Sequence, residues 1–149
     1  GGQSMKTLNW YGLLFVAVIL VPNIVFAATN ANGFENKFSN KKLEVLEQIG
    51  HFSCFAFMFL CIPKLSRGWL FDGAKNAYLI IGAVLVGLYV LGWIVFWNES
   101  SVRKALALSI LPSLLFLESG ILTRNYLLLA SALIFAPCHI AISYMNAVL

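Results

Sequence analysis

Hydrophobic residues gather in five long stretches along the chain, and shorter polar segments separate these stretches. A helix that crosses a bilayer needs about 20 mostly apolar residues, within a range of about 17–25. The pattern therefore predicts an all-α protein, an integral membrane helix bundle with five transmembrane helices. We expect these helices at residues 10–28, 46–63, 77–97, 102–117 and 126–144.

The second and fourth stretches are short for transmembrane helices. The second is expected to gain length by starting at Lys41, with Ser39 or Asn40 as its N-cap. The fourth ends where Glu118 opens a polar segment, which we interpret as a connection over residues 118–125. Four transmembrane helices, with the last two stretches forming a re-entrant or tilted hairpin, are the alternative.

The first residues of the chain allow two interpretations. Gly1 to Ser4 precede Met5 and are interpreted as a cloning remnant, so that residues 5–149 form a single transmembrane helical domain. A lysine, a short apolar run and small residues at its end are also typical of a secretory signal peptide. Because this run is long enough to span a bilayer, we expect it to be a retained first helix.

Composition supports a membrane location. Hydrophobic residues make up 60% of the chain and charged residues 11%. In soluble domains, apolar residues average about 45–50% and charged residues about 25%. A lipid bilayer is therefore the expected surrounding, and the cell membrane the expected location of a multi-pass protein. The ten Lys and Arg are scattered among the loops, which argues against a nucleic-acid partner. They divide evenly between the two sides of a five-helix bundle, and only the group Lys37, Lys41 and Lys42 favours a cytoplasmic first loop.

One face of the second stretch carries an oxygen, nitrogen or sulfur atom at every position. We call it the heteroatom face, and its helical spacing joins Glu44, Glu47, His51, Cys54, Met58 and Cys61. Ionisable groups inside a membrane segment are costly and therefore suggest a functional site. Glu47 and His51 are spaced to pair directly, and with His139 they would form the Glu–His network that proton-coupled transport uses. We expect a polar-lined interior between the second and fifth helices.

The same residues also have a plainer interpretation. In it, Glu44 and Glu47 lie in headgroup water, and His51 makes a hydrogen bond between two helices. Asn23 follows Pro22, which breaks the hydrogen-bond pattern of its helix. Its amide is expected either to bond the carbonyls that the proline leaves without a partner or to contact a ligand.

Sulfur and imidazole ligands suit soft metal ions, so His51, Cys54 and Cys138 are weak candidate metal ligands. One helix face places at most two ligands around one ion, and the chain contains no HExxH or CxxC motif. We therefore predict no metal and no cofactor. The three cysteines lie inside apolar runs, and their odd number does not indicate a disulfide framework.

Small residues recur at four-residue spacing in two stretches. They are Ala83 and Gly87 in the third, and Ala105, Ser109 and Ser113 in the fourth. Such stripes let helix backbones approach closely in a membrane. We expect helix packing within the bundle, with contact between copies in a homo-oligomer as the alternative.

Motifs for catalysis are absent from the sequence, which has neither a GxSxG nucleophile motif nor a glycine-rich phosphate loop. Transport is therefore favoured over an enzymatic function. The leading hypothesis is binding or transport of a small molecule or ion, in which Glu47, His51, His139 and Asn23 contact the ligand or relay protons. The alternative is an accessory or structural subunit that acts through helix packing with a partner membrane protein.

Four segments also suggest a family. They are Pro22-Asn23-Ile24-Val25-Phe26-Ala27, Gly33-Phe34-Glu35-Asn36-Lys37, Glu47-Gln48-Ile49-Gly50-His51-Phe52 and Ala136-Pro137-Cys138-His139-Ile140. In these segments the chain resembles an uncharacterised family of small polytopic membrane proteins from Gram-positive bacteria. The resemblance covers nearly the whole chain. It implies a location in the plasma membrane and no particular mechanism.

Overall fold

The computed structural model describes residues 8–29, 40–62, 68–99 and 101–148. The expectations for Gly1 to Ser4 and for the cap at Ser39 lie outside the described residues. The described part of the chain is all-α. Its helices are α1 (Trp10–Thr29), α2 (Lys41–Phe59), α3 (Ala74–Phe96), α4 (Val102–Leu122) and α5 (Tyr126–Val148).

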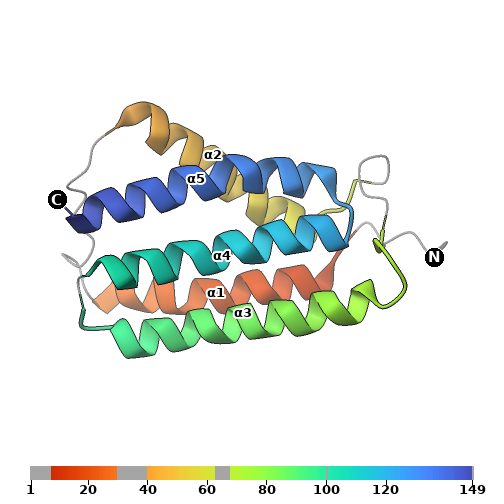
Figure 1. Ribbon diagram of the computed structural model, residues 1–149, viewed down its shortest axis with the longest axis horizontal. Helices are drawn as coiled ribbons and strands as arrows, with labels where there is room; N and C mark the ends of the chain where they lie inside the picture. The colour runs from red at the N-terminus through yellow and green to blue at the C-terminus, as the bar shows by residue number, and fades with distance from the viewer. Residues whose placement is uncertain (1–7, 30–39, 63–67, 100, 149) are drawn as a thin grey trace.

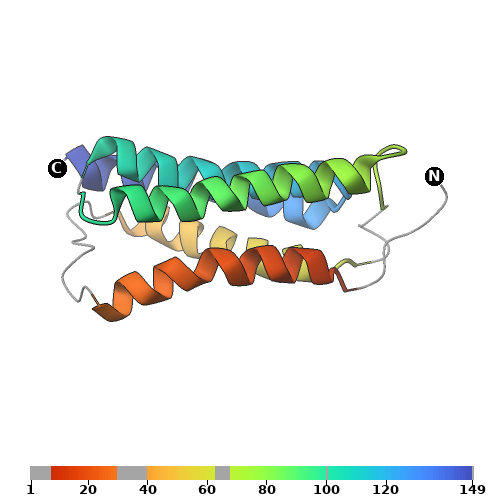
Figure 2. The same cartoon turned by 90° about the horizontal axis from the view of Figure 1, so that it is seen from below.

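Successive helices run in opposite directions along the bundle, as Figure 1 shows, and the start of α1 and the end of α5 lie at opposite ends of it. Figure 2 shows α3, α4 and α5 in one layer, with α1 and α2 on one side of that layer. The most extensive helix contacts are those of α4 with α5, α2 with α5, and α3 with α4. The fold therefore places α5 between α4 and α2, the two helices that carry most of the polar residues discussed below.

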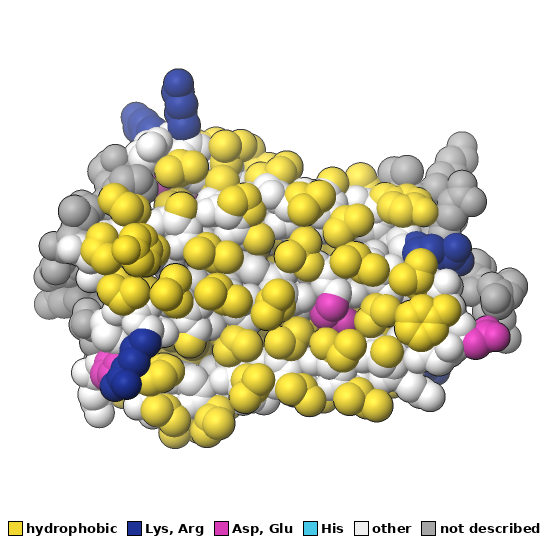
Figure 3. All heavy atoms as spheres, in the orientation of Figure 1, with side chains coloured by type: hydrophobic (Ala, Val, Ile, Leu, Met, Phe, Trp, Pro, Cys, Tyr) yellow, Lys and Arg dark blue, Asp and Glu magenta, His cyan; other side chains and the backbone are white. Residues whose placement is uncertain are grey.

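Three of the helices, α3, α4 and α5, are long and apolar enough to cross a membrane. The structure thus supports a multi-pass membrane protein, whereas five transmembrane helices stay a prediction. Hydrophobic side chains cover the face in Figure 3, and Lys and Arg lie toward its two ends. One acidic side chain lies among the hydrophobic ones, away from both ends. A bilayer can solvate such an apolar surface.

The fourth helix is longer than predicted. It continues to Leu122, so Glu118 lies inside α4 and not in a connection. Two packing features explain the extra turn. A side chain at Gly120 would come within 2.9 Å of the backbone nitrogen of Leu129, so the glycine lets α4 and α5 approach closely. Thr123 Oγ1 donates to the Ser119 carbonyl at 2.6 Å and so satisfies the end of the helix.

The second helix begins at Lys41, and the Asn40 side chain accepts from the Leu43 backbone, which confirms Asn40 as its N-cap. It ends at Phe59, earlier than predicted. The Phe59 carbonyl accepts from the Asn9 backbone nitrogen at 2.7 Å, and Leu60 is extended. Pairing with the residues before α1 therefore replaces the last turn of the expected helix.

Small residues pack the helices, but not always those we predicted. Ser109 and Ser113 of α4 are buried, as expected. Ala83 and Gly87 are exposed, and a side chain at Gly87 would meet nothing within 4 Å. The prediction for α3 was wrong because its packing face is the neighbouring stripe, which holds Ala74, Tyr78, Gly82, Val86, Tyr89 and Trp93.

Candidate functional site

The heteroatom face of α2 turns toward the rest of the bundle. Cys54 and Met58 are buried, and Glu47 and His51 are half-buried. Phe52, which lies on another face of the same helix, is 67% exposed. The sequence therefore identified the inward side of α2 from spacing alone.

A glycine brings α2 close to α5 in the middle of this face. A side chain at Gly50 would come within 2.8 Å of the Phe135 Cα atom and 2.9 Å of its backbone nitrogen. Backbone atoms cannot yield as the end of a flexible side chain can. Only glycine fits this helix crossing without a shift of one helix, and the crossing determines which polar groups of the two helices meet.

Glu47 and His139 meet one turn from that crossing. The His139 Nδ1 and Glu47 Oε1 atoms are 2.9 Å apart, and the side chains are 25% and 17% exposed. The sequence suggested a direct pair of Glu47 with His51 on the same helix, but the structure gives Glu47 a partner on α5. The contact is a hydrogen bond for neutral imidazole and an ion pair once the imidazole is protonated.

His51 joins this site through aromatic stacking. Its ring lies 5.7 Å from the Phe135 ring, and the Phe135 ring lies 4.7 Å from the His139 ring, with an angle of 18° between planes in both pairs. The edge of His51 also packs against Phe55 at 4.3 Å between ring centroids. The structure thus brings Glu47, His51 and His139 together as predicted, with Phe135 between the two imidazoles. We call these four residues the Glu–His site.

Asn23 belongs to a different contact. Its Nδ2 donates to the Ile19 carbonyl at 2.8 Å and to the Tyr89 hydroxyl of α3 at 2.7 Å. Pro22 leaves the Val18 carbonyl without its helical partner, whereas Asn23 bonds the carbonyl of Ile19, so the bond is a local backbone contact and not the one that we predicted. The geometry therefore assigns Asn23 to the packing of α1 against α3.

The weak metal candidates do not form a metal centre. Among the described residues, no three His, Cys, Asp or Glu side chains lie close enough together to hold an ion. Cys54, Cys61 and Cys138 are buried thiols. Of these three residues, His51 contacts α5 through the Phe135 ring, and Cys54 and Cys138 are buried.

Sequence reasoning missed a polar cluster at the other end of the bundle. Asn9 donates through Nδ2 to the Tyr78 hydroxyl at 3.1 Å, and Asn125 Nδ2 donates to the Phe57 carbonyl at 2.9 Å. Asn125 also accepts from the Leu128 backbone at 3.3 Å. The only available signal was an asparagine at each helix start, where that residue is favoured as a cap.

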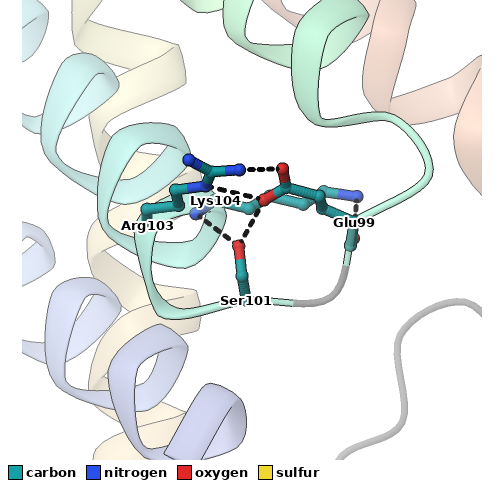
Figure 4. Close-up of polar contacts among 4 residues, drawn as sticks. All are labelled: Glu99, Ser101, Arg103 and Lys104. Carbon is teal, nitrogen blue, oxygen red and sulfur yellow. Dashed lines mark hydrogen bonds and ion pairs between the residues drawn. The ribbon is translucent and has the colours of Figure 1, made fainter.

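A second polar cluster ties α3 to α4, as Figure 4 shows. Arg103 forms an ion pair with Glu99, and the Ser101 hydroxyl donates to the same carboxylate at 2.7 Å. The Arg103 hydrogen bonds, followed by that of Ser101, hold the pKa of Glu99 below its usual range. Lys104 Nζ donates to the carbonyls of Glu99, at 3.1 Å, and Trp97, at 3.2 Å, at the end of α3. This cluster has the geometry of a helix cap, with positive charge at the negative end of α3.

Comparisons with known proteins identify no family: no family model, no curated protein and no solved structure matches this chain. What they and the structure support is a small helical protein with three candidate membrane spans. The predicted resemblance to a Gram-positive membrane family stays a prediction.

Proposed function

We propose that this protein moves protons, alone or together with a small ion or molecule, through the Glu–His site between α2 and α5. The observation that carries the proposal is the 2.9 Å contact of His139 Nδ1 with Glu47 Oε1. Both side chains are partly exposed beside fully buried neighbours. An acid and a base in contact, each partly exposed at the surface of the bundle, can exchange a proton with each other and with a group outside the bundle.

The chemistry of the pair suits this role. Imidazole is the only side chain whose ordinary titration lies between pH 5 and 8. A proton on His139 Nδ1 can pass to Glu47 Oε1, which leaves a neutral imidazole and a neutral carboxylic acid. Isolated charges are expensive in an apolar environment. The pair avoids an isolated charge both before and after the transfer.

His51 extends the site along α2. Its ring stacks with Phe135, which also stacks with His139, so the proposal assigns His51 a proton-accepting position one helical turn along α2 from Glu47. Asn23 takes no part, because Ile19 and Tyr89 occupy its amide. The accessory-subunit hypothesis stays the alternative, and it predicts no proton movement by the purified chain.

Proteoliposomes test the proposal. The protein is reconstituted with a pH-sensitive dye inside the vesicles and a potassium ionophore to hold the membrane potential. We expect proton flux from the wild type, and a loss of about 10²-fold in Glu47→Gln and in His139→Gln, the scale of a positioned acid or base. Glu99→Gln, which changes an exposed carboxylate outside the Glu–His site, should keep the flux. Equal flux in all four proteins, or none above empty vesicles in the wild type, would overturn the proposal.

A further inference from the structure

Glu118 of α4 is a second acid away from the chain's loops; its side chain is half-buried, and the Glu–His site does not use it. One of its oxygens, Oε1, accepts from the Ser119 hydroxyl at 3.1 Å. The other, Oε2, is buried and has no hydrogen-bond partner in the described part of the chain. Because α4 is long and apolar enough to span a membrane, this oxygen lies within a candidate transmembrane helix.

Among the described residues, the groups that act on the Glu118 carboxyl are polar and carry no positive charge. Tyr78 of α3 is fully buried, and its hydroxyl accepts from Asn9. The same hydroxyl shares a hydrogen bond with Ser119 and lies within electrostatic reach of Glu118 and of Cys61, which follows α2. From α5, Leu129 packs beside the neighbouring Gly120. Within residues 8–29, 40–62, 68–99 and 101–148, the titratable neighbours are therefore a phenol and a thiol, both ordinarily neutral at pH 7.

The relative costs decide the state of this carboxyl group. A buried ionised carboxylate without a partner costs tens of kcal/mol in a medium of low polarity, and such groups become neutral instead. A buried neutral hydroxyl without a partner costs roughly 2–7 kcal/mol. Burial therefore favours the protonated acid over the anion, whereas the single hydrogen bond from Ser119 offsets only part of the difference.

We propose that Glu118 is a proton-binding site within the membrane, separate from the Glu–His site, and that it carries its proton at neutral pH. The ligand of this site is a proton, which binds Oε2 while Oε1 accepts from Ser119. A functional role is the usual reason for an ionisable residue inside a membrane helix. The proposal does not depend on proton flux through Glu47 and His139.

Infrared difference spectroscopy of the protein in lipid nanodiscs tests the protonation state. We expect a carbonyl stretch of a protonated carboxylic acid at pH 7, shifted in heavy water and absent in Glu118→Gln. Glu47→Gln serves as the matched control and should retain the band. The proposal is wrong if the band appears only below about pH 4.3, where an ordinary glutamate takes up its proton. It is equally wrong if the band persists in Glu118→Gln.

Labelling of the wild-type protein keeps the proposal testable if Glu118→Gln does not fold. Dicyclohexylcarbodiimide, a hydrophobic reagent, attacks protonated carboxyl groups inside membranes, and mass spectrometry of the peptides locates the adduct. We expect the adduct on Glu118 at pH 7 and none on Glu99, which is exposed and ion-paired. An adduct that excess sodium abolishes at constant pH would overturn the proton as ligand and indicate a metal cation.

Discussion

Gly50→Ala should weaken the contact of α2 with α5 and thereby disturb the Glu–His site. The new methyl group would lie 2.8 Å from the Cα atom of Phe135, which is backbone and cannot rotate away. The two helices must therefore move apart at the crossing. Because Glu47 lies one turn from Gly50 and His139 one turn from Phe135, the same movement lengthens the Glu47–His139 contact.

The magnitude follows from two opposing effects. Insertion of an extra carbon into a well-packed contact costs about 1–3 kcal/mol. Alanine in place of glycine favours a helix by about 1 kcal/mol. Gly87→Ala is the matched control, because a side chain at Gly87 meets nothing within 4 Å and only the second effect operates. The two variants should therefore differ in free energy of unfolding by about 1–3 kcal/mol.

Reversible unfolding in mixed detergent micelles, followed by circular dichroism, gives both free energies. We expect Gly87→Ala to equal or exceed the wild type and Gly50→Ala to fall below Gly87→Ala. If the two variants are equally stable, or if Gly50→Ala is the more stable, then α2 and α5 do not cross closely at Gly50. That result would also remove the reason for the Glu47–His139 contact.

Three further predictions concern the polar clusters at the two ends of the bundle. Asn125→Ala leaves carbonyls of α2 without their donor and should lower the free energy of unfolding in micelles by about 1–3 kcal/mol, whereas an unchanged midpoint would contradict this role. Lys104→Met keeps the apolar stem but removes the charge from the end of α3, so the same assay should show a loss of about 1–2 kcal/mol. Glu99 has a lowered pKa because Arg103 donates to it, so its contribution to stability is present above the usual carboxyl range and is lost as the pH falls through the lowered pKa. Unfolding midpoints across acid pH should show this loss in the wild type but not in Glu99→Gln, and equal slopes would contradict the pairing.

The sequence predicted the helices well where hydropathy alone decides them. The start of α1 at Trp10, of α4 at Val102 and of α5 at Tyr126 agree with the predictions. The ends of α2 and α4 were wrong because contacts distant in sequence decide them. The Asn9 backbone nitrogen donates to the Phe59 carbonyl, and α2 ends there. Gly120 packs closely against α5, and α4 therefore continues past Glu118. A hydropathy pattern contains neither contact.

Part of the candidate site was also predictable. Residue spacing placed Glu47 and His51 on one face of α2, and that face turns inward. Their partners depend on how α2 and α5 cross, which spacing within one helix cannot give, so Glu47 meets His139 and not His51. The charge of Glu118 led us to place it in a connection, whereas the structure places it inside α4 with its Oε2 atom buried.

The central claim is that Glu47 and His139 form an acid–base contact between α2 and α5 in a lipid bilayer. The nitrogen chemical shifts of the histidine side chains in bilayers test it most directly, because the chain contains only two histidines and His51→Gln leaves His139 alone. We predict that adding Glu47→Gln to His51→Gln shifts the His139 Nδ1 resonance, because the contact with the Glu47 carboxylate is lost. A His139 resonance that is identical with and without the Glu47 carboxylate would contradict the contact and, with it, the proposed function.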